Sequence, residues 1–295
     1  MKIVFVGMVE FSLQMLKHLV DNKIEIEGVV TTKKNNFNTD FVNLIPFCKQ
    51  NNIPVLLTTD INEIETINWI KKYQPDVILC MGWSRLIKKQ LLNIPSIGVI
   101  GYHPAALPKN RGRHPIIWAL ALGLSKTGSS FFFMDEGADS GDIISTEDIM
   151  ISKEDNARTL YNKIIATAKQ QILSVVMNLR HGEYSKIPQD NTLANTWRKR
   201  GMKDGEIDWR ISAGNIYNLI RALTRPYVGA HFIKNDHEYK VWDSRVILHS
   251  MYENIEAGKV IDITNCKNLI VKCGNDCIEL LDVDPILDIN IGDYL

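Results

Sequence analysis

The first half of the chain alternates short, wholly apolar runs with segments whose apolar residues recur at helical spacing. Residues 77–81 are apolar throughout, and residues 3–6 form another such run that ends at Gly7. A strand that is apolar at every position is buried on both faces, as parallel strands covered by helices are. The pattern therefore predicts an α/β fold, with a Rossmann-like, mostly parallel sheet and flanking helices. Further extended segments are predicted at 26–30, 54–57, 97–100, 129–133 and 143–151, and helices at 11–19, 41–48, 64–70, 116–122 and 155–181.

The last third of the chain has a different pattern. Residues 183–206 are polar, which is typical of a linker, and a helix is predicted at 213–223. Short strands follow, with turn signals at 234–236 and 273–276, which indicates a small β-barrel-like (OB-like) domain. The predicted division is a catalytic domain at 1–182, a linker at 183–206 and a C-terminal β domain at 207–295. The aromatic residues expected in the core of this last domain are Tyr217, Tyr227, Phe232 and Trp242.

Charge and cysteine content narrow the classes of partner. The whole chain has 34 basic and 34 acidic residues, but residues 205–295 hold 9 basic and 14 acidic ones. Nucleic-acid binding needs clustered Lys and Arg, so we expect no nucleic-acid partner. No apolar run approaches transmembrane length, so we expect no membrane partner. The five scattered cysteines are typical of a reducing compartment, which predicts a cytoplasmic protein with free thiols and no metal.

The strongest candidate for chemistry lies between Gly98 and Asp142. His103 follows an apolar run, and a later loop punctuated by glycines holds Asp135, Glu136, Asp139 and Asp142. A histidine at the carboxyl end of a strand and a carboxylate on a later loop are the parts that general acid–base catalysis needs. The alternatives are a hydrogen-bonded histidine at a corner and a solvated acidic turn. A basic loop at 108–113 lies between them in the sequence.

These segments also carry a family resemblance. HPAALPKNRG at 103–112 is similar to H-P-S-L-L-P-K-Y-R-G, and DEGADSGD at 135–142 places Asp139 36 residues after His103. KIVFVGMVEF at 2–11 and the segment at 207–232 add to the likeness, so that it covers most of the chain. The sequence resembles the formyltetrahydrofolate-dependent formyltransferases, which move a formyl group from 10-formyltetrahydrofolate to an amine.

The resemblance implies a catalytic set of three positions. His103 would stabilise the tetrahedral oxyanion and move protons, and Asp139 would help to deprotonate the amine through a water molecule. Gly101 stands where the family has an asparagine, so another group must supply that amide donor. Alternatively, the chain is a catalytically impaired relative that binds a folate or a sugar.

The resemblance also implies two binding regions. Donor contacts are expected from Trp83, Arg85, Leu86, Ile87, Asp135, Glu136, Gly137 and Ala138. Acceptor contacts are expected from Met8, Glu10, Lys109, Asn110, Arg111 and Arg113. Arginines at a glycine kink can clamp a phosphate or diphosphate. The turn at 7–11 lacks G-x-G-x-x-G, so a dinucleotide cofactor is not supported.

Three acceptors are compatible with the resemblance: an initiator aminoacyl-tRNA, a glycinamide ribonucleotide and a nucleotide-linked amino sugar. The C-terminal domain argues against the short purine-pathway enzymes, which lack one. Its excess of acidic residues argues against tRNA. The favoured prediction is therefore an N-formyltransferase acting on a nucleotide-linked amino sugar for glycan biosynthesis, with methionyl-tRNA formyltransferase as the alternative. A homodimer is compatible with the sequence.

Overall fold

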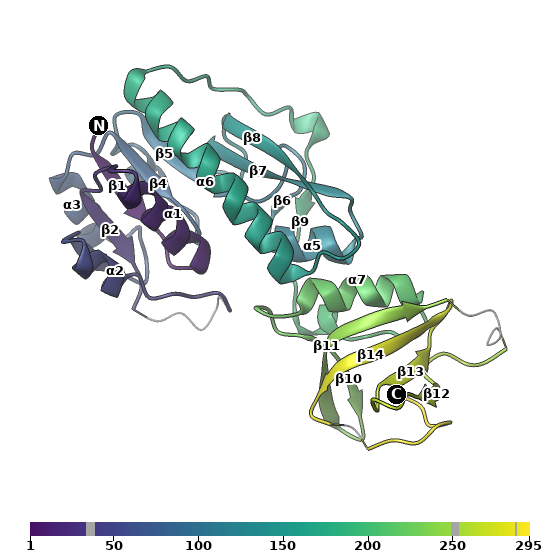
Figure 1. Ribbon diagram of the computed structural model, residues 1–295. Helices are drawn as coiled ribbons and strands as arrows, with labels where there is room; N and C mark the ends of the chain where they lie inside the picture. The colour runs from purple at the N-terminus through teal and green to yellow at the C-terminus, as the bar shows by residue number, and fades with distance from the viewer. Residues whose placement is uncertain (34–38, 249–253, 287) are drawn as a thin grey trace. The chain divides into compact units, whose positions relative to one another are not determined.

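The computed structural model describes residues 1–33, 39–248, 254–286 and 288–295. These residues form two compact units, drawn in Figure 1. The first unit comprises Met1–Pro115, Thr127–Ile149 and Asn162–Trp197. The second comprises Ile116–Lys126, Met150–Tyr161 and Arg198–Leu295. Most of the segment predicted as a linker therefore packs with the first unit, and the division into two domains and a linker stays a prediction.

A seven-stranded sheet organises the first unit, in the order β3-β2-β1-β4-β5-β7-β8. The strands β1 to β5 pair in parallel, and β7 runs antiparallel to β5. All residues of β1, β2 and β4 are buried, as continuous apolar runs require. The predicted mostly parallel sheet is thus confirmed. The strands are β1 (Ile3–Val6), β2 (Gly28–Thr31), β3 (Val55–Leu57), β4 (Val77–Cys80), β5 (Gly98–His103), β7 (Lys126–Phe133) and β8 (Ile143–Met150).

Helices cover this sheet. α1 and α6 lie over the same face in Figure 1, and Lys169 Nζ of α6 donates to Gln14 Oε1 of α1 at 2.8 Å. Ile67 and Ile70 of α3 and Leu91 of α4 pack in a core cluster with residues of β1, β2 and β4. The helices are α1 (Glu10–Asp21), α2 (Ile45–Gln50), α3 (Ile64–Lys72), α4 (Lys89–Leu92), α5 (Pro115–Ala121) and α6 (Ala157–His181).

The start of α2 corrects one expectation. The helix predicted at 41–48 begins only at Ile45. Phe41 forms an isolated antiparallel bridge with Val9, and the Val42 amide donates to the Met8 carbonyl at 3.1 Å. These bonds hold the backbone at 41–42 extended, which the apolar spacing alone did not reveal.

An antiparallel sheet of five strands organises the second unit, in the order β10-β11-β14-β13-β12. The predicted turns join β10 to β11 and β13 to β14, and both pairs are antiparallel. A helix, α7, lies before this sheet in the chain, and Ser212 Oγ caps its N-terminus by accepting from the Asn215 amide. The elements are α7 (Ala213–Leu223), β10 (Ala230–Lys234), β11 (His237–Ile247), β12 (Val260–Ile263), β13 (Leu269–Lys272) and β14 (Cys277–Asp284).

The aromatic residues of this unit do not all belong to its core. Phe232 is buried, whereas Tyr217 and Trp242 line a cavity of about 260 Å³. Trp242 lies at a register shift between β11 and β14, where a bulge interrupts the ladder. The expectation that Tyr217 and Trp242 are core residues was therefore wrong. Within the described ranges, every helix is too short or too polar to cross a membrane.

Candidate active site

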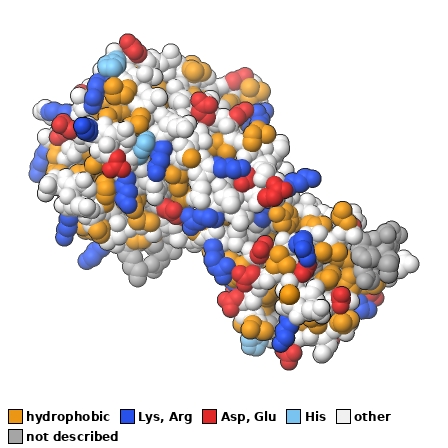
Figure 2. All heavy atoms as spheres, viewed as in Figure 1, with side chains coloured by type: hydrophobic (Ala, Val, Ile, Leu, Met, Phe, Trp, Pro, Cys, Tyr) orange, Lys and Arg blue, Asp and Glu red, His pale blue; other side chains and the backbone are white. Residues whose placement is uncertain are grey.

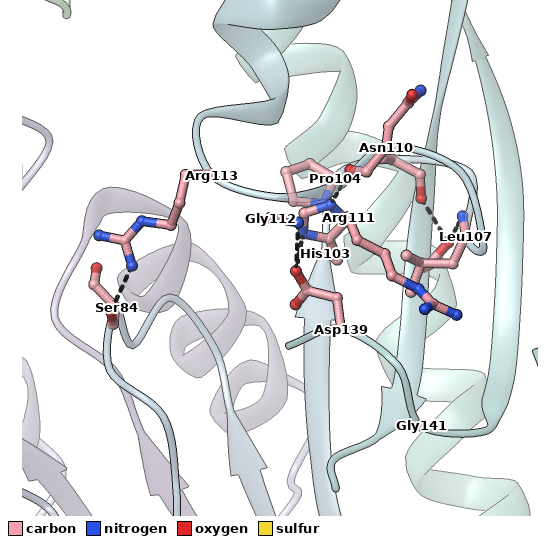
Figure 3. A network of polar contacts seen from close by, with 12 residues as sticks. Ser84, His103, Pro104, Leu107, Asn110, Arg111, Gly112, Arg113, Asp139 and Gly141 are labelled. Atoms are coloured by element: carbon pink, nitrogen blue, oxygen red, sulfur yellow. Dashed lines mark hydrogen bonds and ion pairs between the residues drawn. The ribbon is translucent and has the colours of Figure 1, made fainter. Parts of the chain in front are cut away.

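His103 is the last residue of β5, at the carboxyl end of the parallel sheet, where open α/β folds bind ligands. It is 4% exposed. Its Nε2 lies 2.7 Å from the carbonyl oxygen of Asn110, so this nitrogen carries the proton and donates (Figure 3). The other ring nitrogen, Nδ1, is therefore the one that can face a reacting group.

Asp139 lies beside that nitrogen. Its Oδ2 is 3.6 Å from His103 Nδ1, which is too long for a hydrogen bond but close enough for both groups to act on one reacting atom. The same oxygen accepts from the Gly112 amide at 2.9 Å. Asp139 has a left-handed backbone with φ of 56°, which is uncommon for a non-glycine residue. The chain thus brings together the two residues that the sequence paired.

The loop after His103 is tightly shaped. Asn110 also has a left-handed backbone, with φ of 63°, which turns its carbonyl toward His103. Gly112 has φ of 99°, and a Cβ there would lie 2.3 Å from the Trp197 carbonyl oxygen. Only glycine allows this close approach, in which β6 (Arg111–Gly112) pairs in parallel with β9 (Thr196–Trp197).

The charged residues of this loop differ in what their side chains do. Lys109 is exposed. Arg113 reaches across to the carbonyl of Ser84, with Nη1 at 2.8 Å (Figure 3). Arg111 is only 9% exposed.

The Arg111 guanidinium is bound inside the protein. Its Nε and Nη2 donate to Gln189 Oε1 at 3.1 and 2.8 Å, and Nη2 also donates to Asn191 Oδ1 at 2.9 Å. Asn195 adds a further contact, because its Oδ1 accepts from the Asn110 amide at 2.8 Å. Sequence reasoning missed Gln189, Asn191 and Asn195, because their polar surroundings look like any linker.

Gly101 lies two residues before His103 on β5 and is buried. A Cβ built there would lie 2.8 Å from Met134 Cγ and 2.9 Å from Phe132 Cζ. These apolar side chains fill the volume into which a larger residue would extend. Neighbouring Tyr102 is not a substitute donor, because its hydroxyl is 2.8 Å from Ser129 Oγ and its ring stacks on Phe11.

The predicted donor residues form two segments. Trp83 follows β4 and is half-buried, and its indole Nε1 is buried with no hydrogen-bond partner among the described atoms. Leu86 is 58% exposed, while Ile87 belongs to the core cluster. The segment 135–138 is exposed, and Asp135 Oδ1 accepts from the Gly137 amide at 2.9 Å.

In the loop between β1 and α1, the backbone amides of Met8 and Glu10 already have hydrogen-bond acceptors within the protein. The Met8 amide donates to Ser12 Oγ at 3.0 Å, and the Glu10 amide donates to the Asp40 carbonyl at 2.9 Å. Neither backbone N–H is directed at a ligand, and any contact from these residues must come from their side chains or carbonyls.

The thiol on the strand next to His103 is held in its protonated form. Cys80 ends the neighbouring strand β4, and burial raises the pKa of its thiol to about 12, which keeps it protonated. Among the described residues, we find no group of three or more His, Cys, Asp or Glu side chains that could hold a metal ion. His103 and Asp139, at the carboxyl end of β5, are residue types that serve in acid–base chemistry.

Similarity to known proteins agrees with this site. Residues 1–176 match the family described as formyl transferase, and residues 201–287 match the formyl transferase C-terminal domain. The methionyl-tRNA formyltransferase of Alkaliphilus oremlandii is 32% identical over 289 residues, 96% of this chain and 91% of that protein. The enzyme of the same name from Caldanaerobacter subterraneus is 29% identical over 288 residues, 96% of this chain and 92% of that protein.

The fold is also that of a solved sugar-modifying enzyme. The structure of WlaRD, a sugar 3N-formyl transferase in the presence of dTDP and 5-N-formyl-THF, superposes with a TM-score of 0.73. The match covers 97% of this chain and 99% of WlaRD at 19% identity. This likeness shows the fold, and the family match places the chain in a defined class of group-transfer enzymes. The chain belongs to the formyl transferase family and is a folate-dependent formyltransferase.

Proposed function

We propose that this enzyme transfers the formyl group of 10-formyltetrahydrofolate to the amine of a nucleotide-linked amino sugar. The observation that carries the chemistry is the proximity of His103 Nδ1 and Asp139 Oδ2, which are 3.6 Å apart. They lie at the carboxyl end of the parallel strands, where open α/β sheets bind ligands. The donor supplies an activated formyl group, and the acceptor supplies the amine that attacks it.

His103 and Asp139 have distinct tasks in this proposal. The Asn110 carbonyl fixes the His103 ring by accepting from Nε2, so Nδ1 faces the reacting atoms. In the imidazolium form both ring nitrogens carry a proton, and the Nδ1–H then stabilises the negative charge that develops on the formyl oxygen. Asp139, held by the Gly112 amide, accepts the proton that the amine loses, directly or through water. The tetrahedral intermediate then collapses: the bond between the formyl carbon and N10 of the folate breaks, N10 takes a proton from the His103 imidazolium, and tetrahydrofolate leaves.

The proposed donor surface consists of residues 83–87 and 135–138, which follow β4 and β7, the two neighbours of β5 in the sheet. The half-buried Trp83 and the exposed Leu86 offer aromatic and apolar surface to a flat heterocycle. Arg85 and the segment 135–138, all exposed, complete the proposed donor surface. The Ile87 side chain belongs to the core cluster, so Ile87 is proposed to contribute its backbone groups.

The acceptor would lie on the basic loop. Lys109 is exposed, and Arg113 reaches toward the donor segment, so these two cations are the proposed contacts to a diphosphate. Asn110 presents its side chain away from His103 in Figure 3 and is proposed to contact the sugar. Met8 and Glu10 are proposed to border the acceptor through side chains.

Charge supports a sugar nucleotide over tRNA. Residues 205–295 carry more acidic than basic residues, 14 against 9. On the face seen in Figure 2, Lys and Arg side chains are interspersed with Asp and Glu rather than gathered in one stripe. A protein that binds tRNA must neutralise several phosphates, which needs clustered cations.

A methionyl-tRNA acceptor is the second candidate. Two methionyl-tRNA formyltransferases, 32% and 29% identical, match along 96% of this chain. That likeness is higher than the 19% identity to the sugar 3N-formyl transferase. The two candidates share the site and the donor and differ only in the acceptor, so one assay separates them.

The experiment offers both acceptors to the purified enzyme with 10-formyltetrahydrofolate. Tetrahydrofolate release is followed for a panel of nucleotide-linked amino sugars and for initiator methionyl-tRNA, and the products are weighed by mass spectrometry. We expect one sugar to gain a formyl group, with tRNA formylated far more slowly. Rapid formylation of tRNA alone would overturn the sugar proposal. No transfer to any amine would indicate the impaired, ligand-binding relative instead.

A further inference from the structure

We propose that Gln189 is a positioning residue that sets Asp139 against His103, an inference that rests on the proposed function of that pair. Gln189 lies in the polar segment predicted as a linker. Its side-chain amide makes four hydrogen bonds, two through each end. An amide has two lone pairs and two N–H groups, so Gln189 is fully occupied.

The two ends of the Gln189 amide hold different loops. Oε1 accepts from Nε and Nη2 of Arg111 at 3.1 and 2.8 Å, on the loop that follows His103. Nε2 donates to the carbonyls of Asp139 and Gly141 at 2.9 and 2.7 Å, on the loop that carries the carboxylate. Gln189 is 78 residues from Arg111 and 50 from Asp139, so it links two loops that are both distant from it in the sequence.

Asp139 needs such support because of its backbone. A left-handed conformation is unfavourable for a non-glycine residue and persists only where the surroundings enforce it. The two carbonyls that Gln189 binds lie at Asp139 itself and two residues later, so they bracket the turn. The conformation directs the carboxylate to Gly112 and His103.

The other side of His103 is held from the same segment. The Asn195 side chain accepts from the amide of Asn110, which is also left-handed, and the Asn110 carbonyl accepts from His103 Nε2. Mutual hydrogen bonds between Ile187 and Ile143, at 2.8 and 3.0 Å, anchor the segment to β8. Residues 187–197 therefore fix both ring nitrogens of His103 in relation to their partners.

The burial of Arg111 makes this arrangement sensitive to Gln189. The Arg111 side chain is nearly enclosed, so losing its acceptor would leave a buried charged donor unsatisfied. Arg111 is thus assigned to the same support, and the cations left for the acceptor are Lys109 and Arg113.

Two isosteric substitutions separate the ends of the Gln189 amide. Gln189→Met removes all four bonds, whereas Gln189→Glu keeps an oxygen for Arg111 and removes the two donors to Asp139 and Gly141. If the donors position Asp139, both variants should lower kcat roughly 10–100-fold, with KM for the folate changed little. Gln170→Met, an exposed glutamine on α6, is the matched control and should behave as wild type.

A double substitution tests whether the effect passes through Asp139. In an Asp139→Asn background, Gln189→Met should cost less than about threefold in kcat, because there is no carboxylate left to position. A full additional loss there would mean a general structural role and would overturn the proposal. So would a Gln189→Glu enzyme with wild-type kcat. Melting temperatures identify a variant that fails to fold, and Gln189→Glu then carries the test.

The imidazole resonances of His103 give a readout that needs no acceptor. In protein labelled with ¹⁵N at histidine, Gln189→Glu should shift the His103 Nδ1 signal, while Gln170→Met should not. If the wild-type enzyme formylates no amine but the shift appears, the proposed function fails and the positioning role stands. Unchanged His103 signals in Gln189→Glu would overturn the positioning role.

Discussion

The loop that follows His103 and the segment 135–138 differ in how they are held. The loop at 108–114 is bonded at several points to residues 187–197, and its shape depends on left-handed residues and on a glycine packed against backbone. The segment at 135–138, which starts the loop that carries Asp139, is exposed, and the Asp135 carboxylate accepts from Gly137 and Ser140 of the same loop. The bonded loop lies where atoms must meet at fixed distances, and the exposed segment belongs to the surface that we propose for the donor.

His103→Asn tests the site beside the bonded loop and should have the largest effect. It removes proton transfer and charge stabilisation at Nδ1, so kcat should fall roughly 10²–10⁴-fold. The fold should persist, because His103 ends its strand, and folate binding measured by titration calorimetry should be nearly unchanged. His181→Asn, at the end of α6, is the control. A folded His103→Asn enzyme with most of its turnover would contradict the assignment.

Asp139→Asn should follow, with a loss of about 10²-fold in kcat. The remaining amide oxygen can still accept from the Gly112 N–H, so the loop should keep its shape while the charge beside Nδ1 is lost. Asp135→Asn, on the exposed segment, should act on KM for the donor instead. If steady-state kinetics show the larger kcat effect for Asp135→Asn, the roles of the two carboxylates are reversed.

Gly101→Asn restores the residue that the family has at this position and should nevertheless reduce activity. A Cβ there would press on Met134 and Phe132, and overpacking of this kind costs about 1–3 kcal/mol. The melting temperature and kcat should both fall, and a second substitution, Met134→Ala, should restore part of each loss. Gly214→Asn, where nothing lies within 4 Å of a Cβ, is the control. A large gain in kcat would mean that the native enzyme is a weakened one.

Leu86→Ala tests the proposed donor surface and should have the smallest effect. Removing exposed apolar surface that is proposed to contact the folate should raise KM for the donor about tenfold and leave kcat unchanged. Leu122→Ala, a leucine of similar exposure just after α5, should change neither. A drop in kcat with constant KM would place Leu86 with the groups around His103.

The predictable part of the site follows from local pattern. Apolar runs place His103 at a strand end, and a glycine-punctuated acidic loop follows at 135–142. The fold class follows from the same runs, because burial on both faces leaves few alternatives. Which carboxylate of that loop pairs with His103 is not visible in the pattern; the family resemblance, through the spacing of 36 residues, selects Asp139.

The unpredictable part depends on bonds between distant residues. Gln189 contacts Arg111 across 78 residues through side-chain atoms, and nothing in its polar neighbourhood distinguishes it from a linker residue. The burial of Arg111 depends on that distant contact, which the sequence does not reveal. From the sequence alone, Arg111 therefore looks like a phosphate ligand. Likewise, the sequence pattern around Trp242 is that of a core residue. In the structure, Trp242 lies at a bulge in β11 and lines a cavity, and the sequence does not reveal that bulge.

The most direct test of the account is a structure of the enzyme with 5-formyltetrahydrofolate and a nucleoside diphosphate bound together. The account predicts the folate against Trp83 and Leu86, the formyl-bearing end near His103 Nδ1 and Asp139, and the diphosphate on Lys109 and Arg113. Arg111 should remain bonded to Gln189. A folate bound away from His103, or an Arg111 that leaves Gln189 to hold the diphosphate, would contradict it.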